Sequence, residues 1–311
     1  MIKNEFFFPS TSGLADIHAA SYFPENKDDV KIVLQIAHGM AEHLERYEGF
    51  AEYLTANGIA LYINDHLGHG KSITSRDELG YFGEKDGWMH FVEDCHELTK
   101  IAKKENPGKP CIFFGHSMGS FVARAYAFKY ANEIDGAVIC GTSGKNPLAS
   151  IGIVLAKLIA KIFGSHHRSK LIDKMSFGTY NERFEKRTSF DWLTRDNDIV
   201  DKYIADEDCG FLFTATGSKD LMCLLDYVSS EQWYHGFNKD LPVYVIAGEE
   251  DPVGAYGKGV KEVADGLRAN GVKDVTLTLY PGCRHEILNE SQAFEAVAKG
   301  VVDFAYRVCK L

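Results

Sequence analysis

The sequence predicts an α/β fold in which a mostly parallel central sheet carries helices on both faces and is interrupted by a helical insertion. Short apolar runs alternate with segments of helical periodicity, the pattern of a parallel sheet covered on both sides. This alternation stops between Ser143 and Tyr234 and then resumes. We therefore expect a core built from residues 1–142 and 235–311, and a helical cap built from residues 143–234.

The first half of the chain supplies most of the expected strands. Two short strands are expected at Glu5–Phe8 and Ile17–Phe23, because Pro and Ser/Gly signals bound them. Four continuous apolar runs follow (KIVLQIA, IALYIND, CIFFG and DGAVIC), and such runs are typical of strands buried on both faces. These four strands are expected at residues 31–37, 59–65, 111–115 and 135–140.

Helices are expected between these strands, where apolar residues recur at helical spacing. The first of them ends before Gly58, a residue type that commonly follows a helix. The expected helices cover residues 46–57, 86–105 and 118–130. After the insertion, strands are expected at 241–247 and 275–280 and helices at 260–270 and 291–309.

The expected cap is rich in helix-like segments, charges and aromatic residues. Its most apolar segment, SIGIVLAKLIAKIFG (150–164), carries Lys157 and Lys161 four residues apart on a narrow polar stripe. This helix either packs the cap onto the core or also meets acyl chains or a lipid surface, and we expect at most transient lipid contact. Six aspartates in 191–208 predict a solvated face that disfavours strong adsorption to anionic membranes.

Composition excludes several classes of protein. Of 311 residues, 45% are hydrophobic and 25% charged, as in a globular protein, and the net charge of −10 disfavours nucleic-acid binding. No apolar run is long enough to span a membrane, and the start, MIKNEFFFPSTSG, does not resemble a signal peptide. The seven cysteines are odd in number and never spaced C-x-x-C, so we expect free thiols in the cytoplasm, without a disulfide framework or a zinc site.

A serine between two glycines stands where the CIFFG strand passes into the next helix. Gly115, Ser117 and Gly119 match G-x-S-x-G, and a strand before and a helix after this motif are the context that gives it meaning. The tight turn strains the serine backbone and requires small neighbours. It also exposes the hydroxyl at a helix N-terminus, which favours developing negative charge. Ser117 is therefore a candidate nucleophile that needs a base and an orienting acid.

Candidates for both partners follow later strands. GEEDPVG places Asp251 just after the strand at 241–247, and GCRHEILNE places His285 just after the strand at 275–280. Since the carboxyl ends of parallel strands meet at one edge of a sheet, both should reach the same edge as Ser117. Glu249 and Glu250 compete for the acid role, but Pro252 favours Asp251 by fixing a turn after it.

An oxyanion formed in such a site needs two backbone N–H donors. We expect one from Met118, which follows the nucleophile. We expect the other from Met40, in the loop after the KIVLQIA strand, where Gly39 permits a sharp turn. His38 is expected to hydrogen-bond this loop rather than to act as an acid or base.

At these residues the chain resembles the α/β-hydrolase superfamily, and within it the monoacylglycerol lipase and lysophospholipase group. The matching stretches are HGMAEHLERY, NDHLGHGKS, GHSMGS, GEEDPVG and GCRHEILNE, in the expected order. The resemblance implies a helical cap, fatty-acyl esters as small-molecule substrates, and no metal or organic cofactor. One departure is Ala41, where many relatives have a glycine, and this affects the expected shape of the acyl pocket.

The GHGKS stretch partly matches two other types of site, a phosphate-binding loop and a metal site. A phosphate loop would need glycine where Asp65 stands, and no helix signal begins at Ser72. A metal site at Asp65, His66 and His69 is less favoured than loop-stabilising hydrogen bonds, because relatives carry the same stretch without metal.

Three functions stay open at this point. The first is a serine hydrolase that cleaves fatty-acyl esters through an acyl-enzyme on Ser117. The second uses the same three residues as an aminopeptidase, amidase or acyltransferase. The third is a non-enzymatic binding module, which the presence of a complete candidate triad disfavours. The acyl chain length, the leaving group and the oligomeric state do not follow from the sequence.

Overall fold

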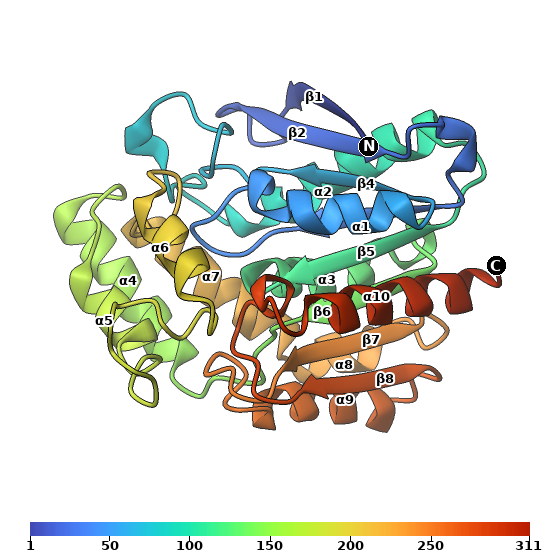
Figure 1. Cartoon of the computed structure of the whole chain (residues 1–311). Helices are drawn as coiled ribbons and strands as arrows, with labels where there is room; N and C mark the ends of the chain where they lie inside the picture. Colours follow the sequence, from blue (N-terminus) through green and yellow to red (C-terminus); the bar gives the residue numbers. More distant parts are fainter.

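An eight-stranded sheet forms the centre of the computed structural model, which describes residues 1–311 (Figure 1). Its strand order is β1-β2-β4-β3-β5-β6-β7-β8. The pairs β1/β2 and β2/β4 are antiparallel and all later pairs are parallel, so the predicted mostly parallel sheet is confirmed. The strands are β1 (Ile2–Pro9), β2 (Asp16–Phe23), β3 (Ile32–Ala37), β4 (Ile59–Asn64), β5 (Cys111–His116), β6 (Gly136–Cys140), β7 (Val243–Gly248) and β8 (Val275–Tyr280).

Helices cover both faces of the sheet. One face is covered by α1 (Glu48–Ala56) and α10 (Phe294–Cys309), in front of the sheet in Figure 1. The other is covered by α2 (Trp88–Glu105), α3 (Met118–Lys129), α8 (Glu231–Gly236) and α9 (Lys258–Ala269). Along β5, Phe113 belongs to one hydrophobic cluster, while Ile112 and Phe114 belong to the other. A strand buried on both faces cannot alternate apolar with polar residues, which explains its continuous apolar run.

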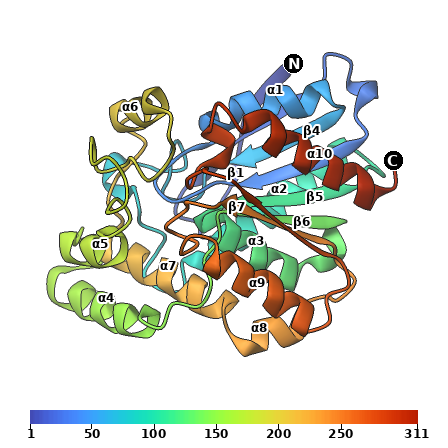
Figure 2. The ribbon, with the colours of Figure 1, turned by 60° about the horizontal axis from the view of Figure 1, so that its bottom comes forward.

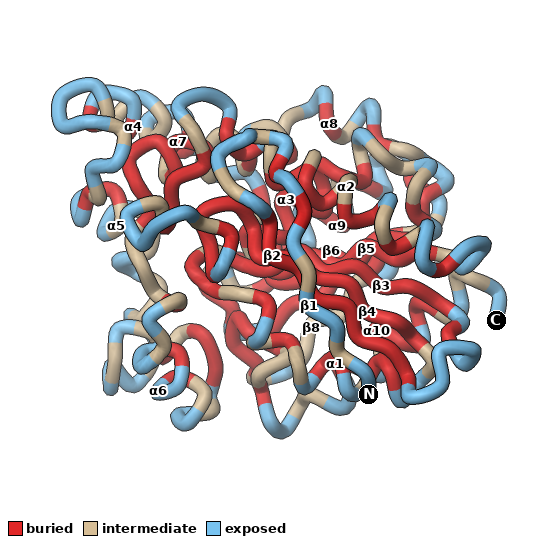
Figure 3. Tube along the Cα trace, turned by 90° about the horizontal axis from the view of Figure 1, so that it is seen from above, coloured by how far each residue is buried: buried red, intermediate tan, exposed pale blue.

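The segment between β6 and β7 is helical, as expected. It contains α4 (Ala149–Phe163), α5 (Lys170–Phe177), α6 (Asn197–Ala205) and α7 (Ala215–Val228) before α8. Figures 1 and 2 show α4, α5 and α6 beyond the carboxyl ends of the parallel strands. The chain returns to the core along α7, whose Leu224 and Val228 belong to the same hydrophobic cluster as α2 and α3. The protruding helices carry many exposed residues, whereas strands β2 to β7 are almost wholly buried (Figure 3).

Some of the observed helices begin slightly later than the periodicity predicts. The helix expected from residue 46 starts as a 3₁₀ turn, Leu44–Tyr47, and becomes α1 only at Glu48. The helix expected from residue 86 starts at Trp88, because Asp86 has a positive φ of 51° that an α-helix cannot accommodate. With 15 residues, α4 is too short to cross a bilayer, and no other helix qualifies.

Candidate active site

Ser117 lies at the sharp turn between β5 and α3. Its φ of 55° and ψ of −121° are strained for a residue with a side chain, as the motif predicts. The turn is held by two hydrogen bonds: the Ser117 N–H donates to the Cys140 carbonyl at 3.0 Å, and the Ser120 hydroxyl donates to the Ser117 carbonyl at 2.6 Å. Ser117 is half-buried and lines a large cavity.

The two flanking glycines are required by close packing. A Cβ atom on Gly115 would lie 2.0 Å from the carbonyl oxygen of Gly119, and one on Gly119 would lie 2.0 Å from the carbonyl oxygen of Ala37. No side chain fits at either distance. The turn can therefore form only with glycine at both positions.

His285 and Asp251 are joined by a hydrogen bond at the same edge of the sheet. Nδ1 of His285 lies 3.0 Å from Oδ2 of Asp251, and both side chains are almost wholly buried. The other Asp251 oxygen accepts from the Val253 N–H at 2.8 Å, which holds the carboxylate in place. Glu249 and Glu250, the competing acids, are exposed to solvent. His285 lines the same cavity as Ser117.

The loop after β3 approaches the serine turn closely. A Cβ atom on Gly39 would lie 3.2 Å from Ser117 Cβ and 2.7 Å from Glu42 Oε1, so this position is restricted to glycine by contact. The left-handed residue in the turn is Ala41, with φ of 51°, not Gly39. Gly39 therefore brings the two loops together, and the sharp turn expected of it is made two residues later.

Both expected oxyanion donors, Met40 and Met118, line the cavity with Ser117. The N–H of Met40 donates to no backbone carbonyl. The N–H of Met118 is the first of α3, and the first N–H groups of a helix have no acceptor within it. Both groups are thus free to donate to a bound oxygen atom.

The cavity is large and mainly apolar. Its volume is about 750 Å³, and 23 of its 44 lining residues are hydrophobic. It lies between the serine turn and the insertion, since α4, α5 and α7 contribute to its walls. On α4, Leu155 lines the cavity, whereas Ile159 is buried in a small cluster with Ala156, Ile172 and Ala215.

A buried charge network that sequence reasoning missed surrounds this site. Glu42 accepts from the Gly39 N–H, from the Tyr47 hydroxyl at 2.9 Å and from Arg46 at 2.6 Å. Arg46 also forms a two-point ion pair with Glu286, both contacts at 2.7 Å. The network therefore connects the loop after β3 to the residue next to His285. All three charged residues lie within the stretches HGMAEHLERY and GCRHEILNE, which are the signal that could have identified them.

The network fixes the charge states of its members. Burial alone would raise the pKa of Glu42, but the charge of Arg46 and the hydrogen bond with His116 hold it well below its usual range. Burial likewise opposes the charge on His116, yet the hydrogen bond and charge of Glu42 raise its pKa above the usual value. Glu42 is thus a buried anion in contact with cationic groups.

Of the histidines expected to support the loops, His38 and His69 form hydrogen bonds within them, whereas neither ring nitrogen of His66 has a partner, so the hydrogen bonds expected of His66 are not found. His38 donates from Nδ1 to the Gly39 carbonyl and accepts the His66 N–H at Nε2, so its predicted loop-stabilising role is confirmed. Asp65 accepts from the Leu44 and Lys71 N–H groups, as a loop-stabilising residue should. Burial lowers the pKa of His38 and His66, and that of His69 to about 3, so all three are neutral at physiological pH.

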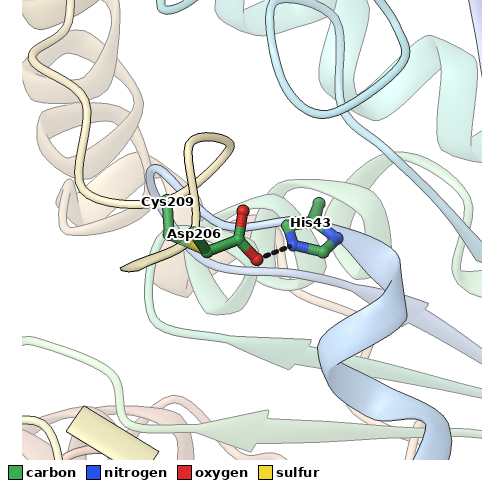
Figure 4. A group of neighbouring side chains, drawn as sticks. All are labelled: His43, Asp206 and Cys209. Atoms are coloured by element: carbon green, nitrogen blue, oxygen red, sulfur yellow. Dashed lines mark hydrogen bonds and ion pairs between the residues drawn. The ribbon is translucent and has the colours of Figure 1, made fainter. Parts of the chain in front are cut away.

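One group of side chains could hold a metal ion. The donor atoms of His43, Asp206 and Cys209 lie within 4.8 Å of one another, between the loop after β3 and the end of α6 (Figure 4). His43 Nε2 and Asp206 Oδ2 are already joined by a 2.8 Å hydrogen bond, and burial raises the pKa of the Cys209 thiol. An ion would have to break that bond and displace the thiol proton. The His43–Asp206 hydrogen bond joins the core to the insertion, and this role needs no metal ion.

A strained serine turn, a histidine–carboxylate pair and free N–H donors at one edge of a mostly parallel sheet are typical of an α/β-hydrolase. The Hydrolase_4 family, described as serine aminopeptidase, S33, matches residues 28–292, and the chain belongs to this family. A monoacylglycerol lipase from Mycolicibacterium smegmatis is 30% identical over 93% of this chain and 92% of its own length. A thermostable carboxyl esterase from Bacillus coagulans, solved with glycerol, is 31% identical over 99% of both chains, with a TM-score of 0.92.

Two further structures agree with this assignment. One described as a lipase in its open form is 27% identical over both full chains, with a TM-score of 0.88. A monoglyceride lipase from Saccharomyces cerevisiae, with a TM-score of 0.78 and 20% identity, shares the fold. The chain is thus a carboxylic-ester hydrolase similar to the monoacylglycerol lipases.

Proposed function

We propose that this enzyme cleaves fatty-acyl esters similar to monoacylglycerols or lysophospholipids through an acyl-enzyme on Ser117. The observation that carries the proposal is that one large apolar cavity is lined by Ser117, by His285 and by both candidate N–H donors. An acyl chain needs such a cavity, because each methylene removed from water contributes about 0.8 kcal/mol to binding.

The reaction takes place in two steps. In the first, His285 accepts the proton of the Ser117 hydroxyl while its oxygen attacks the ester carbonyl, and the N–H groups of Met40 and Met118 bind the oxyanion. His285 then gives the proton to the departing alcohol. In the second, His285 takes a proton from water, which attacks the acyl carbonyl, and then gives that proton to the Ser117 oxygen as the bond to the acyl group breaks and the acid is released. Asp251 holds the His285 ring in one tautomer and stabilises its cationic form throughout.

The segment 143–234 is proposed as the cap over this site. Leu155, Met175 and Met222 from this segment line the cavity together with Ser117. The cap therefore determines which acyl chains and leaving groups fit, while the core supplies the reacting groups. This division is the reason that the sequence alone leaves the substrate open.

The first experiment identifies the nucleophile. A fluorophosphonate probe should label the wild type once, on Ser117, and should not label Ser117→Ala. Labelling that persists in the folded Ser117→Ala variant would overturn the assignment. A circular-dichroism spectrum of the variant serves as the control for folding.

The second experiment identifies the substrate class. Monoacylglycerols and lysophospholipids of increasing acyl length should be compared with an aminoacyl anilide. The anilide tests for peptidase activity, because the matching family is described as serine aminopeptidase and one relative is a proline iminopeptidase. We expect kcat/KM to rise with acyl length on the esters and to be lowest on the anilide. A preference for the anilide would favour the aminopeptidase alternative.

A further inference from the structure

The loop that carries His285 lies beyond the end of the sheet. Strand β8 ends at Tyr280, five residues before His285, so strand pairing does not fix the backbone at the histidine. The side chain of His285 is held by Asp251, but its backbone N–H must find an acceptor elsewhere, because a buried N–H without an acceptor is costly. The groups that bind this backbone therefore help to decide where the imidazole stands.

Those acceptors come from the insertion. The N–H of His285 donates to the Trp192 carbonyl at 3.4 Å. The N–H of the next residue, Glu286, donates to the Leu193 carbonyl at 2.7 Å. Both carbonyls belong to residues 184–195, here called the histidine clamp. Two successive N–H groups of the catalytic loop are thus bound to two successive carbonyls of the clamp, as in a short pair of strands.

Arg284, the residue before the histidine, extends from the core into the clamp. Its guanidinium donates to the carbonyls of Asp191 and Thr194 at 2.6 and 3.3 Å. It also donates to both carboxylate oxygens of Glu185 at 2.7 and 2.8 Å, and it lies 4.3 Å from the centre of the Phe184 ring. Because Arg284 is almost wholly buried, these charge-assisted bonds are poorly replaced by water.

The clamp is fixed by hydrogen bonds of its own. The carboxylate of Asp191 accepts the N–H of Thr188 at 3.1 Å and its hydroxyl at 2.5 Å. The side chain of Asn181, just before the clamp, accepts the Trp192 N–H at 3.0 Å and donates to the Thr188 carbonyl at 2.7 Å. The clamp therefore presents its carbonyls to the catalytic loop in a defined arrangement.

The imidazole of His285 also contacts one ring from each part of the chain. The His116 ring, from the core, lies 4.8 Å from it between centroids, and the Trp192 ring, from the clamp, lies 5.2 Å from it. Both distances are ordinary contacts between aromatic rings. Trp192 also lines the cavity that contains Ser117. The insertion thus touches the ring as well as the backbone of the catalytic histidine.

We infer that the histidine clamp holds His285 in its reactive position, and that Arg284 is the positioning residue that fastens the catalytic loop to it. The inference rests on the proposed function, in which His285 is the base. It adds that the insertion supports the catalytic machinery, besides shaping the cavity. A misplacement of about 1 Å can cost about 100-fold in rate, so the loss of this support should be visible in turnover.

The first measurement is steady-state kinetics on p-nitrophenyl acetate, which is too short to depend on the acyl cavity. Arg284→Met keeps the length of the side chain without its donors, and should lower kcat about 10- to 100-fold with little change in KM. Arg284→Lys keeps the charge and one donor group, and should recover part of this loss. Glu185→Gln changes only the exposed partner and should lower kcat about two- to fivefold. The last two variants decide the question if Arg284→Met does not fold.

The second measurement needs no substrate. The proton between His285 Nδ1 and Asp251 should give a far-downfield signal in the ¹H NMR spectrum of the free enzyme, and Asp251→Asn should abolish it. In Arg284→Met this signal should be broadened or lost, because a displaced ring holds the proton less firmly. Since the signal does not depend on an ester, a wrong substrate class would leave this result unchanged, which separates the inference from the proposed function.

Two other arginines provide matched controls. Arg124 is also buried and donates to the carbonyls of Ser143 and Val228, at 3.0 and 2.6 Å, outside the clamp. Arg124→Met should lose stability in urea unfolding but keep kcat and the proton signal. Arg187 lies in the clamp but pairs with Asp201 at 2.7 Å, away from the catalytic loop, and Arg187→Met should behave like the wild type.

Two outcomes would overturn the inference. The first is a wild-type kcat and proton signal in the folded Arg284 and Glu185 variants, which would leave Arg284 with a role in stability alone. The second is an equal loss of kcat and signal in Arg124→Met, which would show that any buried arginine of the insertion boundary has the same effect.

Discussion

The carboxylate of Glu42 accepts a hydrogen bond from the backbone N–H of Gly39, with 2.5 Å between Oε1 and the nitrogen. Gly39 precedes Met40, whose N–H is a proposed oxyanion donor. A buried anion thus holds the residue before the donor. Because Arg46 and His116 keep Glu42 ionised, the contact is a charge-assisted hydrogen bond, which is stronger than a neutral one.

Glu42→Gln should therefore lower kcat while KM changes little. The variant keeps the size of the side chain but loses the charge that fixes the Gly39 loop. Since loss of one oxyanion donor costs about 100- to 1,000-fold, a displaced donor should cost about 10- to 100-fold. Steady-state kinetics with a soluble ester measure the two constants, and Glu45→Gln, an exposed neighbour, is the control. An unchanged kcat in a folded Glu42→Gln would assign this carboxylate to stability alone.

Asp251→Asn should reduce turnover by about 10,000-fold, because the amide favours the wrong tautomer of His285. Glu250→Gln, one residue away and exposed, should have little effect. Both are measured as kcat on the same ester. A larger loss of kcat in Glu250→Gln than in Asp251→Asn would assign the role of orienting acid to Glu250.

Leu155→Asp should reduce kcat/KM for p-nitrophenyl decanoate at least about tenfold more than for the acetate, since a charge in the cavity opposes burial of methylenes. Leu158→Asp is the matched control, because it lies on the same helix but outside the cavity. Ile159→Asp should instead unfold the cap, as Ile159 is buried. An unchanged ratio of decanoate to acetate in Leu155→Asp would place the acyl chain elsewhere.

Ala41→Gly should leave stability nearly unchanged. The left-handed backbone of Ala41 costs about 1–2 kcal/mol for a residue with a Cβ atom, and glycine removes this cost. This gain offsets the greater flexibility of the unfolded glycine variant and the loss of one buried methyl group. Ala264→Gly, also buried but within α9, should lose about 2 kcal/mol. Urea unfolding measures both changes. An equal loss in the two variants would show that Ala41 carries no backbone strain.

Acid should destabilise the protein partly through His69. Burial holds its pKa at about 3, below the ordinary value of 6.5, so the unfolded chain binds a proton that the folded chain does not. Its stabilising contribution is complete above pH 6.5 and is lost as the pH falls toward 3. Urea unfolding measures the free energy of unfolding at about pH 7.5 and at about pH 5.5. The drop in this free energy between the two pH values should be about 1.4 kcal/mol smaller for His69→Gln than for the wild type. The control is His235→Gln, an exposed histidine, which should show the same drop in the free energy of unfolding as the wild type. The same drop in His69→Gln would mean that His69 is protonated in the folded protein.

Much of the core was predictable because its strands are buried on both faces. Strands such as β5 and β7 appear as continuous apolar runs. Strand β5 ends one residue before Ser117, β7 ends three residues before Asp251, and the half-buried β8 ends five residues before His285. The residues that follow a parallel strand all reach one edge of the sheet. Strand order in the sequence was therefore enough to predict that these three residues lie at the same edge of the sheet.

The supporting network could not be predicted in the same way. Glu42 and Arg46 are four residues apart, a spacing typical of a solvated pair on a helix surface. Only the fold brings Glu286 against Arg46 and buries both carboxylates. Likewise, α4 is apolar on most of its surface, so its sequence could not distinguish Leu155, which lines the cavity, from Ile159, which does not.

The insertion leaves the sheet after β6 and returns at β7, and these two strands are direct neighbours, with Ala137 opposite Val243. The sheet register therefore does not depend on what lies between them. Since α7 packs in the core and is capped by Thr214, the exchangeable cassette is residues 143–213. Under the function proposed above, a graft of this cassette from a relative should change the range of esters accepted, provided that it keeps the carbonyls of Trp192 and Leu193 that accept the N–H groups of His285 and Glu286.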